Sequence, residues 1–148
     1  MKDLIYKLLE KSIQSLLLYE SVQEKMIKAT VDNPSRLKSY QVIADNCIQM
    51  AAVNWCKVFG SKKSKMYYAT DKNLDKKLFL SFVEARDASF QEIGDKMRSF
   101  RDKYGEGNYS QEEVTKLFMR ALDVIDAYEH ALGERSLMEL YRNASMEL

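Results

Sequence analysis

Apolar residues recur every three or four positions along four segments of the chain, which is the period of an amphipathic α-helix. The segment near residues 3–30 carries a stripe formed by Leu4, Ile5, Leu8, Leu9, Ile13, Leu16, Leu17, Val22, Met26 and Ile27. Near 34–59 the stripe is Leu37, Tyr40, Ala44, Cys47, Ala51 and Val58, and near 110–132 it is Val114, Leu117, Phe118, Ala121, Leu122, Ile125, Tyr128 and Leu132. Between these segments, a seven-residue repeat interrupted only by Arg86 predicts one continuous helix near 72–104.

Local signals set the ends of these helices. Asn33 is a good N-cap, followed by Pro34 at the first helical position. Ser110 and Glu113 have the spacing of a capping box, in which each side chain bonds the backbone of the other residue. Gly60 is expected to end the second helix in the left-handed conformation, and Gly133 to loosen or end the fourth.

The third helix is expected to stop at Gly105-Glu106-Gly107-Asn108. Four helices with broad apolar stripes and short connections predict an all-α, antiparallel four-helix bundle. We expect a single domain over 1–148, with its core in residues 3–132. A short helical segment near 134–146 follows, with the apolar face Leu137, Leu140 and Tyr141.

The net charge of +1 gives no global argument for a nucleic-acid or membrane partner. Residues 57–104, however, carry 12 basic and 7 acidic side chains, a local charge of +5. Residues 61–70 are rich in lysine and serine and are expected to form an exposed loop. The lysines form either a solvated loop or a phosphate-facing patch, and with exposed tyrosines they would offer a partner surface formed by Lys62, Lys63, Lys65, Tyr67 and Tyr68.

Cofactor and metal chemistry are not expected. Cys47 and Cys56 are nine residues apart, on opposite faces of one predicted helix, so they cannot bridge each other within it. With no secretory segment in view, this favours a reducing cytoplasm, and no apolar run is long enough to predict a membrane span. The chain has one histidine, His130, and no metal-ligand motif; Asp126, one turn before it, is its expected local partner.

Two short motifs carry a family resemblance that covers roughly residues 1–130. The second predicted helix ends in Asn54-Trp55-Cys56-Lys57-Val58-Phe59-Gly60, where Trp55 and Phe59 are placed to pack one turn apart. The third ends in Phe100-Arg101-Asp102-Lys103. Together they resemble the HEPN superfamily of small helical RNA-cutting and nucleotide-binding proteins, in its abortive-infection-like branch.

The resemblance implies metal-independent RNA cleavage across a homodimer. Arg101 matches the arginine that faces the scissile phosphate, and Asp102 matches the polar residue beside it. Glu106 occupies the slot of the histidine that serves as acid or base. A glutamate has a reference pKa of about 4.3, so near neutrality it holds no proton to donate, and its charge repels a phosphodiester.

Arg98 and Arg101 are three residues apart on one helix face, and Lys103 is close by, so these three side chains are a candidate phosphate- or RNA-binding site. An ordinary solvated arginine or a protein interface would give the same pattern.

From this resemblance and the missing histidine, we expect a noncatalytic HEPN-like protein. It would bind RNA or a partner protein in a phage–host conflict or toxin–antitoxin setting. A homodimer with the third helix near its interface is expected. The alternatives are a metal-independent ribonuclease toxin that uses Arg101, and a helical inhibitor or adaptor whose resemblance to the family is superficial.

Overall fold

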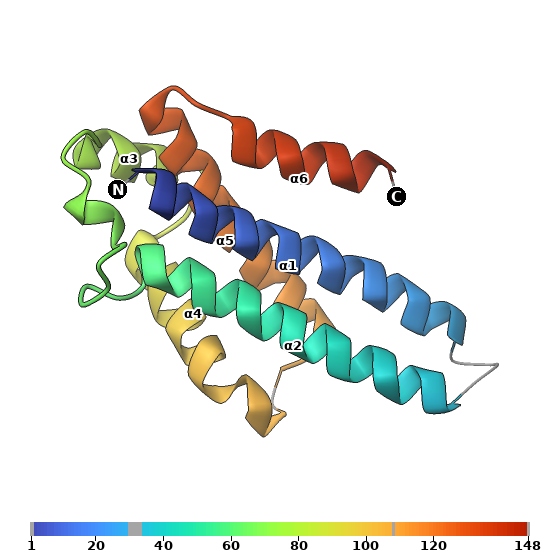
Figure 1. Cartoon of the computed structure of the whole chain (residues 1–148). Helices are drawn as coiled ribbons and strands as arrows, with labels where there is room; N and C mark the ends of the chain where they lie inside the picture. The colour runs from blue at the N-terminus through green and yellow to red at the C-terminus, as the bar shows by residue number, and fades with distance from the viewer. Residues whose placement is uncertain (1, 30–33, 108, 148) are drawn as a thin grey trace.

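The computed structural model describes residues 2–29, 34–107 and 109–147, and over these ranges it contains six α-helices and no strand (Figure 1). The helices are α1 (Lys2–Ala29), α2 (Pro34–Phe59), α3 (Lys76–Glu84), α4 (Phe90–Lys103), α5 (Gln111–Leu132) and α6 (Ser136–Glu147). Two short 3-10 helices, η1 (Tyr68–Thr70) and η2 (Tyr104–Glu106), lie between them. The predicted all-α class is confirmed. The predicted end of the first helix at Thr30 and the Asn33 cap lie outside the described residues.

The helices pack around one apolar core. Figure 1 shows α1 and α2 side by side. Helix α1 also contacts α6, and α2 also contacts α4. Helix α5 contacts α3, α4 and α6. Ile5, Leu9 and Ile13 of α1 are fully buried, as their spacing predicted. Trp55 of α2 is also buried, and its indole N–H donates to the carbonyl of Ala121 in α5 at 3.1 Å.

The prediction of one helix over residues 72–104 is wrong. The helical segment begins at Lys76, after the N-cap Asp75, and it is broken between Glu84 and Phe90. Within the break, Asp87 adopts φ 53°, the left-handed conformation that Asp tolerates better than most residues. The seven-residue repeat therefore runs through two separate helices, α3 and α4, that both face the core.

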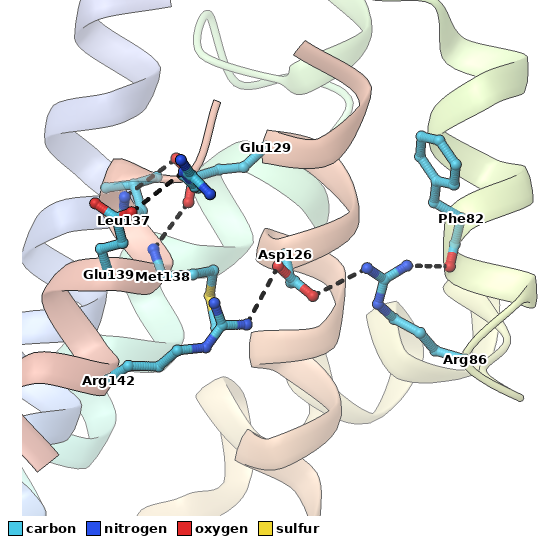
Figure 2. Close-up of polar contacts among 9 residues, drawn as sticks. Phe82, Arg86, Asp126, Glu129, Leu137, Met138, Glu139 and Arg142 are labelled. Carbon is cyan, nitrogen blue, oxygen red and sulfur yellow. Dashed lines mark hydrogen bonds and ion pairs between the residues drawn. The ribbon is translucent and has the colours of Figure 1, made fainter. Parts of the chain in front are cut away.

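Side chains at the break explain why the helix stops. Arg86 donates to the carbonyl of Phe82 at 2.6 Å and to the carboxylate of Asp126 in α5 at 2.9 Å (Figure 2). The first bond satisfies a carbonyl that has no partner at the end of α3. Ser89 then starts α4, because its hydroxyl accepts the N–H of Glu92 at 3.3 Å. The arginine that interrupts the apolar repeat thus marks the end of a helix.

Helix ends elsewhere confirm some signals and correct one. Ser110 is the N-cap of α5 and accepts the Glu113 N–H at 3.1 Å, although Glu113 reaches the Ser110 hydroxyl rather than its backbone. Gly133 ends α5 with φ 70°, and Gly107, just after η2, has φ 77°. Gly60 directly follows the last residue of α2, as expected, but its φ is not positive, so the expectation of a left-handed cap there is wrong.

The C-terminal segment forms α6, which is fixed to the rest of the fold by a buried carboxylate (Figure 2). Glu129 of α5 is 1 % exposed, and it accepts the N–H groups of Leu137 at 3.1 Å and Met138 at 2.8 Å. These are among the donors that a helix leaves unpaired at its N-terminus. The hydroxyl of Tyr6 in α1 donates to the same carboxylate at 3.2 Å. One side chain therefore joins α1, α5 and α6.

Candidate functional site

The two family-like motifs lie next to each other in the structure. Arg98 of α4 donates to the carbonyl of Gly60, the last residue of the α2 motif, at 3.0 Å. Gly60 is buried, and a Cβ atom there would lie 3.1–3.2 Å from atoms of Cys56, so a larger residue would fit only if Cys56 shifted by a few tenths of an ångström. The end of α2 and the C-terminal half of α4 thus form one structural unit.

Cys56 lies under the arginines of this unit. Burial raises the pKa of its thiol to about 11, while the charges of Arg101 and Arg98 act in the opposite direction. Both cysteines are free thiols, with Cys47 half-buried and Cys56 fully buried. A buried thiol with a raised pKa is a poor nucleophile, which gives Cys56 a packing role.

Arg101 is paired with the next residue along the helix. Its Nε donates to Asp102 at 2.9 Å and its terminal nitrogen donates to the second carboxylate oxygen at 3.4 Å. This hydrogen bond is the largest cause that lowers the pKa of the Asp102 carboxyl. Arg98 likewise pairs with Asp95. Both candidate phosphate-binding arginines are therefore already partly neutralised by carboxylates.

Glu106, in the histidine slot of the motif, is an exposed residue of η2. Its neighbour Tyr104 donates to Asp45 of α2 at 2.7 Å, which fixes the start of this turn against α2. The carboxylate of Glu106 thus lies in solvent at the end of α4.

The lysines that follow α2 are exposed, but the tyrosines beside them are not a free surface. Lys62, Lys63 and Lys65 are exposed in the turns that precede η1. Tyr67 is half-buried, and Tyr68 is 7 % exposed and packs on the core aromatic rings Phe59, Phe79 and Phe90. The expectation that residues 61–70 form one exposed loop is wrong, because Tyr68 anchors the end of the segment in the core.

His130 does not pair with Asp126 as expected. Asp126 instead bonds Arg86, and Arg142 of α6 lies 3.7 Å from its other oxygen (Figure 2). The exposed His130 ring packs edge-on against Phe82 of α3 at a centroid distance of 4.2 Å. The histidine therefore belongs to the α3–α5 contact and not to the end of α4.

Sequence reasoning missed a surface groove of about 1000 Å³ between α4 and α5, lined in part by Glu92, Lys96 and Arg120. At 100° per residue these α4 positions lie opposite Arg98 and Arg101 on the helix. The break at residues 85–89 forms one end of the groove, so its position could not be predicted from a continuous helix.

Within the described ranges, none of the helices has the length and apolar character of a membrane span, and no group of three or more His, Cys, Asp or Glu side chains is arranged to hold a metal ion. Comparison with protein-family models, curated proteins and solved structures likewise gave no match to this chain.

Proposed function

We propose that this protein binds the phosphate backbone of RNA and does not cleave the RNA. The binding site would be the basic surface formed by Lys57, Lys62, Lys63, Lys65, Arg98 and Arg101. Lys103 is left out of this surface, because at 100° per residue it lies on the same side of α4 as Lys96, opposite the two arginines. The observation that carries the proposal is the Arg98–Gly60 hydrogen bond of 3.0 Å, because it joins the lysine-rich segment after α2 to the arginine-bearing helix α4.

The lysines are the main attraction for phosphate in this proposal. Lys57, Lys62, Lys63 and Lys65 are all exposed, and they form no ion pair with any residue that the structure describes. Each is therefore available to displace a counterion from the RNA backbone. Arg101 would have to exchange its contact with Asp102 for a phosphate, so its contribution depends on that exchange.

The absence of cleavage in this proposal follows from the acid at position 106. A solvent-exposed carboxylate next to a bound phosphodiester repels it, and position 106 has no imidazole to transfer a proton. His130, the only histidine in the sequence, is engaged with Phe82 of α3.

The wider assignment is also a proposal. We infer a HEPN-like arrangement in which α1, α2, α4 and α5 form an antiparallel four-helix bundle, with a homodimer interface near α4. Support comes from the packing of α1 on α2, α2 on α4 and α4 on α5, and from the joined motifs. A phage–host or toxin–antitoxin setting is the biological context that this resemblance favours. Light scattering at tens of micromolar tests the dimer, and a monomer there contradicts it.

Binding is tested by fluorescence anisotropy with a labelled single-stranded RNA at several salt concentrations. Wild type is compared with a variant in which Lys57, Lys62, Lys63 and Lys65 are replaced by Ala. We expect at least about a tenfold loss of affinity and a shallower salt dependence, since each phosphate contact contributes about −0.7 to the slope for single strands.

The matched control replaces four exposed lysines of α1, namely Lys7, Lys11, Lys25 and Lys28, with Ala. It removes the same charge from a different helix and should keep most of the affinity. Equal losses in both variants would mean non-specific attraction. No RNA binding by wild type would leave a protein partner as the better hypothesis.

The ribonuclease alternative is tested separately, by incubating a mixed RNA pool with wild type, Arg101→Ala and Glu106→His proteins in excess chelator. We expect intact RNA with wild type. Cutting by wild type that disappears in Arg101→Ala would establish the alternative.

A further inference from the structure

The hydroxyl of Tyr128 is a polar group in an apolar environment. Tyr128 lies in α5 with no exposed surface, and its ring packs edge-on against Phe59 of α2 and Phe79 of α3, at centroid distances of 5.6 and 6.0 Å. Its hydroxyl has no hydrogen-bond partner among the described residues. A buried hydroxyl without a partner is unfavourable, and such groups are normally paired with protein or with ordered water.

Asp71 presents the complementary problem at the end of η1. Its side chain is 4 % exposed, and Oδ1 accepts the N–H of Asn73 at 3.0 Å. The second oxygen, Oδ2, is buried and has no partner in the same part of the chain. Tyr128 thus has an unused donor and Asp71 an unused acceptor.

The two groups belong to one cluster. The N–H of Asp71 donates to the carbonyl of Tyr68 at 3.2 Å, and the Tyr68 ring packs on the same two rings, Phe59 and Phe79, that surround Tyr128. The pKa of Tyr128 is raised first by burial and then by the charges of Asp71 and Glu134. The separation of Tyr128 and Asp71 is nevertheless too long, or the geometry too poor, for a direct hydrogen bond.

We propose that one buried water molecule binds between the Tyr128 hydroxyl and Asp71 Oδ2, accepting from the former and donating to the latter. Buried waters typically make about three hydrogen bonds to groups that otherwise lack partners. The water would connect η1, at the end of the lysine-rich segment, to α5. This inference is independent of whether the protein binds RNA.

The test uses ¹⁷O magnetic relaxation dispersion, which counts long-lived internal waters in solution. Wild type is compared with Tyr128→Phe, which removes only the hydroxyl. The control is Tyr104→Phe, because Tyr104 donates directly to Asp45 at 2.7 Å and should involve no bridging water. We expect Tyr128→Phe to lose one long-lived water and Tyr104→Phe to lose none.

A crystal structure of the wild-type protein provides the second measurement if a variant folds poorly. Water density within hydrogen-bond distance of both Tyr128 OH and Asp71 Oδ2 is the expected result. A direct bond between these two atoms, a metal-like cation at the position, or an unchanged water count in Tyr128→Phe would each overturn the proposal.

Discussion

The C-terminal ends of α5 and α4 both hold charged side chains in polar contacts, but in different surroundings. Glu129 of α5 is 1 % exposed and accepts two backbone N–H groups and a tyrosine hydroxyl. Arg101 of α4 has a side chain that is 30 % exposed, and its partner Asp102 is 61 % exposed. The first site excludes water and joins three helices, whereas the second is open to solvent.

This difference separates stability from binding. A buried carboxylate that loses its partners leaves unsatisfied groups inside the protein, which is costly. An exposed ion pair exchanges its partner for water or for a ligand at little cost. We therefore expect the α5 end to determine how firmly α6 is held, and the α4 end to be able to accept phosphate without a change of fold.

The largest expected effect is that of Glu129→Gln. The amide cannot accept from Leu137, Met138 and Tyr6 as the carboxylate does, and its own NH₂ group faces donors. We expect the free energy of unfolding in urea to fall by about 3 kcal/mol. Glu106→Gln at the exposed α4 end is the matched control, with an expected change within about 0.5 kcal/mol. Similar changes in the two variants would remove the distinction between the ends.

Alkaline pH is expected to destabilise the protein through the buried thiol under Arg98 and Arg101. The pKa of Cys56 is raised from 9.0 to about 11 in the folded state, so between these values the unfolded chain binds fewer protons. The stabilisation is fully present below pH 9 and is lost as the pH rises to 11, by about 1.4 kcal/mol per pH unit.

Urea unfolding at several pH values measures this slope, and Cys56→Ala should reduce it. Tyr68, whose pKa is raised from 10.0 to about 12 mainly by burial, adds to the slope at higher pH. An unchanged slope in Cys56→Ala would show that the thiol is not responsible.

An intermediate effect is expected at the helix break. Arg86→Met removes the hydrogen bonds from Arg86 to the Phe82 carbonyl and to the Asp126 carboxylate. The side chains of Arg86 and Asp126 are only 24 % and 29 % exposed. We expect a loss of about 1–2 kcal/mol in thermal or urea unfolding. Lys116→Met is the control, because the Lys116–Glu112 pair is 77 % and 76 % exposed and should contribute below about 0.5 kcal/mol. A loss no greater than that of the control would mean that Arg86 does not stabilise the break.

The smallest effect on stability is expected for the triple substitution of Lys62, Lys63 and Lys65 by Ala. These side chains are exposed, so the free energy of unfolding should stay within about 0.5 kcal/mol of wild type. A fall in melting temperature of many degrees would show that the lysines hold the segment in place.

The extent to which the fold could be predicted depends on how local each signal was. Ser110 and Gly133 cap α5 through the backbone of residues next to them in the sequence, so both ends of α5 could be located from the sequence. The break before α4 has a local signal as well, since Ser89 and Glu92 have capping-box spacing, but the seven-residue repeat runs across it and hides it. Arg86 within an apolar stripe was the second sign of that break.

The contacts between distant segments could not be predicted in this way. Glu129 is one of several acidic residues in α5, and nothing in its surroundings shows that α6 returns to place N–H groups on it. Tyr68 lies in a lysine-rich segment, and its burial depends on Phe59, Phe79 and Phe90 meeting in space. At the candidate site, the sequence identified Arg98 and Arg101 but not their pairing with Asp95 and Asp102 or the bond to Gly60.

The most direct test of RNA binding without cleavage is a mobility-shift reaction in excess chelator, with the same RNA then recovered and run on a denaturing gel. The account predicts that wild type shifts the RNA, that the Lys57, Lys62, Lys63 and Lys65 to Ala variant shifts it much less, and that the recovered RNA keeps its full length. RNA that is shortened by wild type, or that is not shifted at all, would contradict it.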